Sequence, residues 1–463
     1  MTKTENHSAE EKRTKIPASL LITFAVLSIS GGLGNCSQTA VNALLIGMST
    51  EMGVSVATSQ WLTTGYILAL GVFVPLAPFL TKRFSERFMM MVALGCIAAG
   101  SLLVIAVPLF PVALIARVMQ AAGAGLMMPA MQTMVMVDMP RERMGLFMGI
   151  NGVAMGFMVN LGPTIGGALE SAFGWKSFFW LMFGFMVAMM VPTMKCARSQ
   201  GGNKQERFDA PSFITCGIGF VGLLLGFSNA SNLGVTHVAV WLPIIVGSLL
   251  IAMFVRREKR MANPLISMNI FADRQYCWGF IGSCVLSAAF VGTMLVVPLY
   301  VEDLRGGTAL DAGIVLLPAS LMALVANVGA GALMDKFGAR KVLIATTTFL
   351  VVGAVLALFC DDETPLWFLA VSQAVRALGI SGSIGPFIGW SLEKLPYHIV
   401  SDGSSFLTVG RQACASLGTA AMVLLIVTFS QMGQVVFAYH AAFFFSVVFS
   451  VLTFLVAVLK VRS

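Results

Sequence analysis

Charged side chains are scarce in this 463-residue chain: Asp, Glu, Lys and Arg make up 11% of it, whereas soluble domains average about 25%. Apolar residues make up 57%, and the mean hydropathy is +0.88. So few charges cannot cover a water-exposed surface of this size, which excludes a soluble globular protein. The apolar residues form long runs rather than the ~10-residue alternating segments of a membrane barrel, so we predict an all-helical integral membrane protein.

Sequence signatures of catalysis are also missing. No Gly-x-x-x-x-Gly-Lys-Ser/Thr loop is present, which argues against direct use of ATP. The eight cysteines form no Cys-x-x-Cys pair, and no group of His, Cys and acidic residues has the spacing of a zinc site. Stacking platforms for nucleic acid are absent as well. We therefore expect a protein that is not an enzyme, holds no metal or cofactor, binds no nucleic acid and lies in the lipid bilayer.

Fourteen apolar runs are long enough to cross a bilayer at ~20 residues per crossing. They lie at 18–48, 56–80, 88–107, 110–137, 144–169, 177–195, 211–229, 236–254, 277–301, 312–334, 340–360, 366–391, 403–430 and 438–459. Lysine and arginine test this count, because they concentrate in cytoplasmic loops. With both termini in the cytoplasm, 24 of the 29 Lys and Arg fall on cytoplasmic segments. We therefore predict a multi-pass protein of the cell (inner or plasma) membrane with both termini cytoplasmic.

The loops divide the chain into parts. The two longest cytoplasmic loops, 196–210 and 255–276, bracket the seventh and eighth spans. We therefore predict a cytoplasmic tail at 1–17, a six-helix bundle at 18–196, two inserted spans with their flanking loops at 197–275, a second six-helix bundle at 276–460 and a cytoplasmic end at 461–463. No segment is long enough for a soluble domain, and we expect a monomer.

Three motifs rich in glycine or polar residues stand out against the apolar background. They are Arg117-x-x-Gln120-x-x-Gly123 in the fourth span, Gly162-Pro163-x-x-Gly166-Gly167 in the fifth, and Gly331-x-x-x-Asp335-Lys-Phe-Gly338-x-Arg340 after the tenth. Glycines three or four residues apart share one helix face and let a second helix approach closely. That face could serve tight packing alone, or it could slide against a neighbouring helix.

These motifs together resemble the major facilitator superfamily, and more closely its fourteen-helix drug:proton antiporter branch. The resemblance covers essentially the whole chain from about residue 18. It implies two pseudo-symmetric six-helix bundles with two inserted helices, a central cavity, transport by rocking of the bundles, and proton-driven export of lipophilic, often cationic, compounds. The residues that it assigns to the conformational change are Gly162, Pro163, Gly166, Gly167, Gly331, Asp335, Gly338 and Arg340.

Acidic residues are absent from the middle of every predicted span. The antiporter branch commonly carries a carboxylate in its first span, where this chain has Ser37, and its first loop motif has Lys82 in place of Asp. Proton coupling usually needs a titratable group at membrane depth. The acids nearest to that depth, and therefore the candidates for proton coupling, are Glu170, Asp138, Glu302 and Asp303.

Polar residues within the spans are candidates for a substrate cavity. An arginine at mid-span costs at least ~2.5 kcal/mol to insert, so each of three such arginines either stabilises helix packing or contacts a ligand. The candidates are Asn35, Gln38, Asn42, Arg117, Gln120, Asn151, Arg376 and Arg411. Three arginines without a mid-span carboxylate disfavour permanent cations as substrates.

The sequence therefore predicts a secondary active transporter that exports lipophilic or amphipathic small molecules, in the manner of multidrug efflux, in exchange for protons. The 30 Met and 34 Phe suit a pliable apolar cavity. Two alternatives stay open. One is a transporter of the same fold for a single metabolite, an anionic one included, with weak or no proton coupling. The other is a membrane sensor or scaffold that has lost transport.

Overall fold

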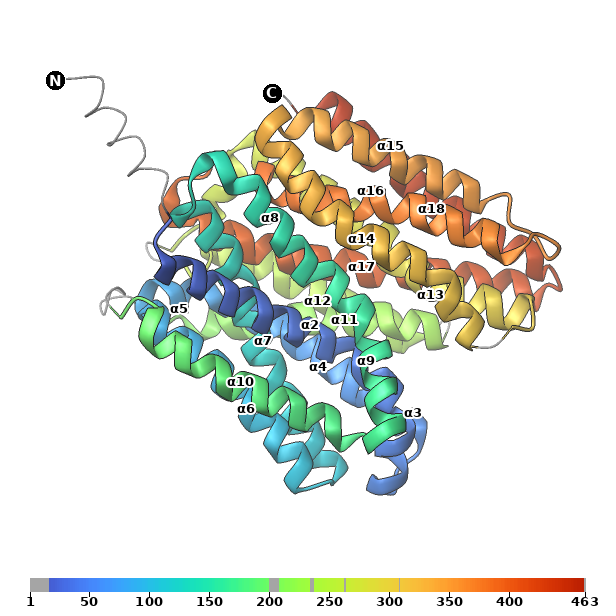
Figure 1. Cartoon of the computed structure of the whole chain (residues 1–463), viewed down its shortest axis with the longest axis horizontal. Coiled ribbons are helices and arrows are strands. Elements are labelled where there is room, and N and C mark those ends of the chain that lie inside the picture. Colours follow the sequence, from blue (N-terminus) through green and yellow to red (C-terminus); the bar gives the residue numbers. More distant parts are fainter. Residues whose placement is uncertain (1–15, 200–207, 234–236, 262–263, 308, 462–463) are drawn as a thin grey trace.

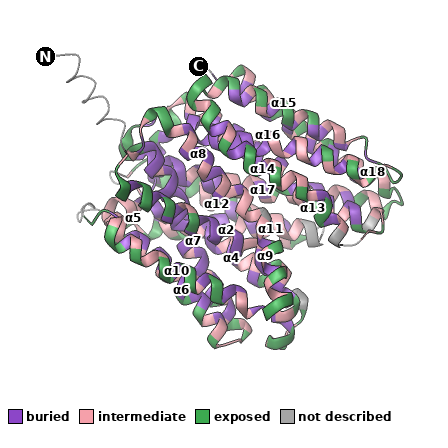
Figure 2. Ribbon diagram, viewed as in Figure 1, coloured by how far each residue is buried: buried purple, intermediate pink, exposed green. Residues whose placement is uncertain are grey.

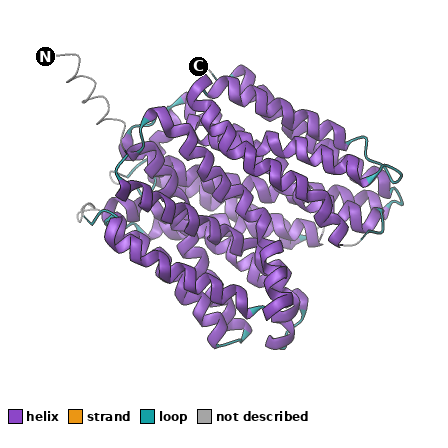
Figure 3. Ribbon diagram, viewed as in Figure 1, coloured by secondary structure: helices purple, strands orange, loops and turns teal. Residues whose placement is uncertain are grey.

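The computed structural model describes residues 16–199, 208–233, 237–261, 264–307 and 309–461. Within these residues every regular element is a helix (Figure 3). The predicted all-helical membrane fold is thereby confirmed. Residues 1–15 of the predicted N-terminal tail, residues 200–207 of the 196–210 loop and the last two residues lie outside the described residues.

The long helices agree with the fourteen predicted spans. Thirteen described helices are long and apolar enough to cross a membrane, and a bent pair at 141–157 and 161–173, with 50° between its parts, makes a fourteenth. The first six spans are α2 (Ala18–Met52), α4 (Trp61–Phe73) with its continuation α5 (Ala77–Arg83), α6 (Glu86–Ala106), α7 (Phe110–Asp138), α8 (Met144–Gly152) with its continuation α9 (Met158–Phe173), and α10 (Lys176–Cys196). The others are α11 (Ala210–Leu233), α12 (Val238–Glu258), α13 (Arg274–Leu299), α14 (Ala309–Phe337), α15 (Ala339–Ala357), α16 (Leu366–Leu392), α17 (Val400–Gln431) and α18 (Val435–Leu459).

Local sequence signals position the helix ends. The carboxylate of Asp273 accepts hydrogen bonds from the backbone N–H of Gln275 at 2.6 Å and of Tyr276 at 3.0 Å, which caps the start of α13. Gly338, with φ of +81°, is the single residue between α14 and α15. A side chain would be strained in that conformation, so glycine allows the tight turn.

The helices form two bundles, α2 to α10 and α13 to α18, with α11 and α12 beside them (Figure 1). Helix α11 packs against α4 of one bundle and α17 of the other, and α12 packs against α11. The bundles lie close together at the end where α2 begins and α18 ends, and they diverge toward the other end. We call the first end the basic end, because its loops and helix termini carry Lys82, Arg141, Lys336 and Arg340.

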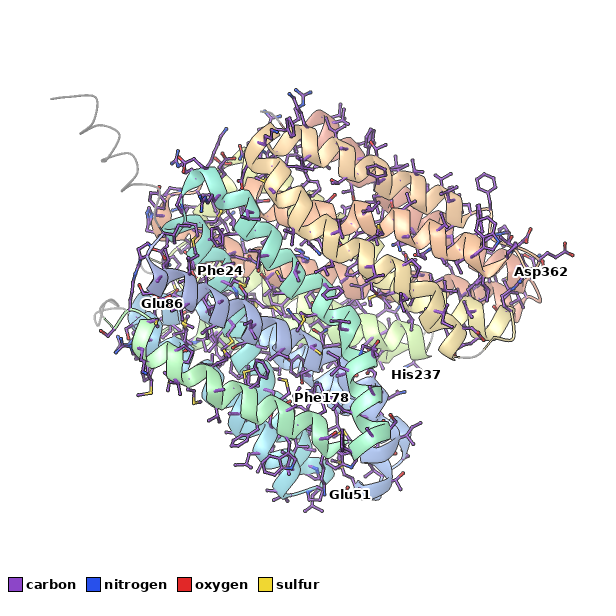
Figure 4. The ribbon with its side chains drawn as sticks, in the orientation of Figure 1. Phe24, Glu51, Glu86, Phe178, His237 and Asp362 are labelled. Atoms are coloured by element: carbon purple, nitrogen blue, oxygen red, sulfur yellow. The ribbon has the colours of Figure 1, made fainter. Side chains whose placement is uncertain are left out.

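The acidic residues labelled in Figure 4 mark the two ends. Glu86 lies at the basic end, whereas Glu51 and Asp362 lie at the far tips of different bundles (Figure 4). At the tip of the first bundle, Lys176 forms an ion pair with Glu51 at 2.5 Å. The wide separation of Glu51 and Asp362 in this view reflects the divergence of the bundles.

Buried residues face the inside of the bundles, and exposed apolar side chains cover their outer faces (Figure 2). Ile115, Leu249 and Val325 are 58–62% exposed. In water such a surface would be unfavourable, but lipid tails cover it without cost. The outer face therefore fits a protein that spans a bilayer.

Candidate substrate cavity

A cavity of about 330 Å³ lies where the two bundles and α11 meet. Its lining comes from α2, α4, α7 and the α8–α9 span of one bundle, from α13 and α17 of the other, and from α11. Because helices of both bundles line the cavity, a rotation of one bundle against the other changes its shape and its access.

Much of the lining is apolar and adaptable. It includes Met128, Met155, Phe227, Phe290 and Met294, which come from three different regions of the chain. Methionine side chains adopt many shapes and are polarizable, and phenylalanine rings offer flat apolar contacts. The cavity therefore suits apolar molecules of varied shape.

Two of the predicted polar residues on α2, Asn35 and Gln38, line this cavity. The amide of Asn35 donates a hydrogen bond to the carbonyl of Ala154 at 3.2 Å. The neighbouring Thr39 hydroxyl donates to the carbonyl of Val159 at 2.7 Å. These bonds fix α2 against the α8–α9 span and place one polar stripe of α2 on the cavity wall.

Arg411 on α17 also lines the cavity, and it is the one charged residue among those that line it within the described part of the chain. Its Nε donates to the hydroxyl of Ser287 on α13 at 3.0 Å. Its Nη1 is buried and has no hydrogen-bond partner among the described residues. Nε of this guanidinium is thus held by the protein, whereas Nη1 is not.

Arg376 lines a second, smaller pocket of about 90 Å³, which shares Phe290 and Met294 with the cavity. Its Nη2 donates to the hydroxyl of Thr293 at 2.7 Å, and its Nη1 donates to Gln373 at 3.2 Å. The bond to Thr293 joins α16 to α13, and the bond to Gln373 lies within α16.

Arg117 and Gln120 do not belong to the lining of either pocket. Arg117 is fully buried, and its Nη1 donates to the hydroxyl of Ser37 and to Gln120, each at 2.8 Å. Its Nε donates to the carbonyl of Leu62 at 3.2 Å, and its guanidinium lies 4.2 Å from the ring centre of Tyr66. This arginine holds α7 against α2 and α4.

The other two predicted cavity residues also lie apart from this lining. Asn42 is exposed, and its carbonyl accepts a hydrogen bond from Thr63 at 2.9 Å. Asn151 is buried, with no partner for its amide among the described residues. Sequence reasoning missed lining residues such as Phe227 and Ser287, because an aromatic or a serine inside an apolar run gives no sign of the face it occupies.

At the basic end, side chains of the two bundles contact each other and hold the bundles together. The ammonium of Lys82 on α5 lies 2.8 Å from a carboxylate oxygen of Asp402 on α17. The side chain of Asp402 is fully buried. Beside this pair, the hydroxyls of Thr81 and Ser401 are 3.1 Å apart. The sequence gives no sign of the burial of Asp402, because its partner lies 320 residues away.

A second contact joins the bundles through Asp335 at the end of α14. Its two carboxylate oxygens accept hydrogen bonds from the backbone N–H of Gly145 at 2.6 Å and of Leu146 at 2.8 Å. These N–H groups lie in the first turn of α8, where they have no partner within the helix. Asp335 therefore caps α8 from the opposite bundle. Gly338 and Arg340 of the same motif lie at the turn that follows, where Arg340 is exposed.

The glycines of the α8–α9 span serve two different interfaces. A Cβ on Gly145 or Gly149 would overlap backbone oxygens of α14 in the other bundle. A Cβ on Gly162 or Gly166 would instead overlap the backbone of α2. Pro163 and Gly167 of this motif make no such close approach: Pro163 is exposed, and the nearest atom to a Cβ on Gly167 is 3.9 Å away.

The candidate proton-coupling acids are scattered. Glu170 is partly buried at the far end of α9, and a Cβ on Gly47 of α2 would lie 2.5 Å from its Oε1. Asp138 forms an ion pair with Arg198 at 2.8 Å at the basic end. Glu302 is exposed, and the side chain of Asp303 lies outside the described residues.

Two bundles of membrane helices around a shared cavity, joined by capping and ionic contacts at one end, define the architecture of a membrane transporter. The match to known families agrees: the model of the major facilitator superfamily covers residues 27–419, so this chain belongs to that superfamily. It is a multi-pass membrane transporter and not an enzyme.

Two relatives and one solved structure show how far the likeness extends. The lincomycin resistance protein LmrB of Listeria monocytogenes is 29% identical over 400 residues, covering 86% of this chain and 85% of LmrB. The multidrug resistance protein B homolog of Mycobacterium tuberculosis is 27% identical over 418 residues, covering 89% of this chain and 77% of that protein. The crystal structure of the human organic anion transporter MFSD10 matches with a TM-score of 0.69 at 11% identity, covering 95% of this chain and 100% of that one, which shows a common fold.

Proposed function

We propose that this transporter exports amphipathic small molecules in exchange for protons. The observation that carries the proposal is the cavity between the bundles, in which methionine and aromatic side chains share the lining with amides, hydroxyls and one arginine. Such a lining suits a molecule with an apolar body and a polar group. The relatives named for lincomycin and multidrug resistance support the same class of substrate.

The charge on the two ends indicates how the protein is oriented in the membrane. Because lysine and arginine concentrate on the cytoplasmic side of membrane proteins, the basic end faces the cytoplasm in our proposal. The contacts of Lys82 with Asp402 and of Asp335 with α8 then close the cytoplasmic side, which is the arrangement of an outward-facing state. A transport cycle would break both contacts and open the basic end to take up substrate.

Glu170 is the acid that we assign to proton coupling. It lies on α9 where that helix meets Gly47 of α2, so any shift of α9 along α2 changes its access to water. A carboxyl group whose hydration changes with conformation binds and releases a proton during the cycle. The preserved Asp335 cap and the close glycine contacts between bundles support transport over a sensor or scaffold role.

Dye efflux tests the export proposal. Cells that express the protein should lose several structurally unrelated amphipathic dyes faster than cells without it, and an uncoupler should abolish the difference. Efflux that persists after the proton gradient has collapsed would contradict proton coupling. Equal dye loss from both cell types would contradict export.

Proton release on dye binding tests the role of Glu170. Purified wild-type protein should release protons when a transported dye is added, whereas the Glu170→Gln variant should release far fewer. Glu363→Gln is the matched control, because Glu363 is an exposed acid at the same end of the molecule. If Glu170→Gln releases as many protons as the control, another group carries the coupling.

A further inference from the structure

The three arginines within the spans differ in how many of their side-chain nitrogens donate hydrogen bonds to other groups of the protein. Arg117 donates hydrogen bonds from Nε and from both terminal nitrogens. Arg376 donates from both terminal nitrogens and leaves only Nε without a partner among the described residues. Arg411 donates from Nε to Ser287, while its buried Nη1 has no partner within the same residues. Of the three, Arg411 alone lines the larger cavity.

No carboxylate of the described chain compensates the charge of Arg411. None of the four recorded ion pairs includes it, and none of the residues that line the cavity is acidic. Arg411 lies 11 residues from the start of α17, which is about 16 Å along the helix at 1.5 Å per residue. This depth is near the middle of a membrane, where electrostatic attraction is only weakly screened by water.

We infer that the cavity takes amphipathic acids, that is, organic molecules with a carboxylate or sulfonate group on an apolar body. The inference rests on the proposed function in that it names the substrate class of the same cavity. The anionic group accepts hydrogen bonds from Arg411, whose planar guanidinium matches two acceptor oxygens. Ser287 holds the guanidinium through Nε, and the amides of Gln38 and Gln412 line the same cavity as further donors.

The apolar wall selects against small inorganic anions. Met128, Phe227 and Phe290 line the cavity together with Arg411. An inorganic anion gains nothing from these contacts, whereas an aromatic or aliphatic body buries its surface against them. A permanent cation is repelled by the guanidinium. The combination therefore favours molecules that carry both an acidic group and a hydrocarbon part.

A matched pair of probes measures the effect of the ligand's negative charge on binding. Tritium-labelled naphthalene-2-carboxylate and naphthalene-2-carboxamide share the same ring system and nearly the same volume, but only the first is an anion. Their binding to the purified full-length protein is measured by scintillation proximity. Wild-type protein should bind the carboxylate at least about tenfold more tightly, as one charge-assisted hydrogen bond would give.

The variants separate the role of Arg411 from that of its neighbours. Arg411→Gln should bind the two probes equally, and Arg411→Lys should retain part of the preference because it keeps the charge. Ser287→Asp keeps the arginine but places a carboxylate at its Nε, so it should also abolish the preference. Lys259→Gln removes a positive charge at an exposed position outside the cavity and should bind both probes as the wild type does.

The results separate this inference from the proposed function. Equal binding of the two probes by the wild type, or a preference that survives in both Arg411→Gln and Ser287→Asp, would overturn the inference. Uptake of amphipathic dyes that carry no permanent positive charge, into inverted membrane vesicles under a proton gradient, tests export independently. A clear carboxylate preference without such uptake supports the inference and contradicts the proposed function, whereas uptake without the preference does the reverse.

Discussion

Lys82 and Asp402 form an ion pair that joins the two bundles, although 320 residues separate them in the chain. The ammonium of Lys82 lies 2.8 and 2.9 Å from the two carboxylate oxygens. The backbone N–H of Ser267 also donates to Asp402, at 3.1 Å. The side chain of Asp402 is fully buried, whereas that of Lys82 is 29% exposed. Of these contacts, the ion pair with Lys82 joins the two bundles, so the buried carboxylate keeps its cation only while the basic end is closed.

Loss of the Lys82 ammonium should open the basic end. In Lys82→Met, the closed state would bury Asp402 without its cation, and removing one partner of a buried pair costs up to about 3–5 kcal/mol, less here because Lys82 is 29% exposed. Amide hydrogen exchange at 400–408 should rise by about tenfold or more. The exchanged pair Lys82→Asp with Asp402→Lys should restore slow exchange. Unchanged exchange in Lys82→Met would mean that the pair does not hold this end closed.

The cap from Asp335 should stabilise the same closed end. Asp335→Ala removes the acceptor for two N–H groups at the start of α8, and the loss of a helix cap costs about 0.5–2 kcal/mol. We expect a lower melting temperature in detergent and slower dye efflux. Asp335→Asn keeps one acceptor oxygen and should be intermediate, while Lys336→Ala, at the next exposed position, should match the wild type. Equal melting of Asp335→Ala and Lys336→Ala would refute the capping role.

Two glycines one half-turn apart on α14 provide a sharp test of close helix approach. A Cβ on Gly331 would overlap the backbone of Gly145 on α8, whereas a Cβ on Gly329 has no atom within 4 Å. Gly331→Ala should therefore prevent the bundles from closing at the basic end and reduce efflux by about tenfold or more, since overpacking costs about 1–3 kcal/mol. Gly329→Ala should preserve efflux and could raise stability by up to about 1 kcal/mol, because alanine favours a helix. Similar efflux by the two variants would contradict this assignment.

The sequence predicts the spans well because apolar length and the placement of Lys and Arg are properties of single segments. It also identifies Asp335 and the fifth-span glycines, because their spacing is local. The sequence does not predict which helix each of these glycines contacts. Gly145 meets α14 and Gly162 meets α2, although both lie on one span with similar glycine spacing. The two glycines lie on either side of the 50° bend of that span, and the sequence pattern does not encode that bend.

Helix rotation explains why only some of the predicted cavity residues line the cavity. Arg117 and Arg411 look alike in the sequence, since each lies mid-span and close to a glutamine. In the structure, Arg117 points to Ser37 and the ring of Tyr66, and Arg411 lines the cavity. The difference is set by packing between distant helices. A single sequence contains no signal for it when both faces of a helix are apolar.

Arg117 should therefore act on stability and not on substrate choice. Its side chain is fully buried and donates to Ser37, Gln120 and the carbonyl of Leu62. Arg117→Met would leave these acceptors without their donor, at a cost of at least about 3 kcal/mol for two charge-assisted hydrogen bonds. Arg117→Lys should be destabilised as well, because one ammonium cannot donate in all three directions from the same position.

The measurement compares thermal melting with probe preference in the same preparations. Arg117→Met and Arg117→Lys should melt at lower temperature than the wild type, and the protein that remains folded should still prefer naphthalene-2-carboxylate to its amide. Arg411→Gln should show the opposite pattern, with a smaller change in melting and no preference. If Arg117→Met melts normally but loses the preference, then Arg117 contacts the substrate in another state of the cycle, and the division of roles between the two arginines is wrong.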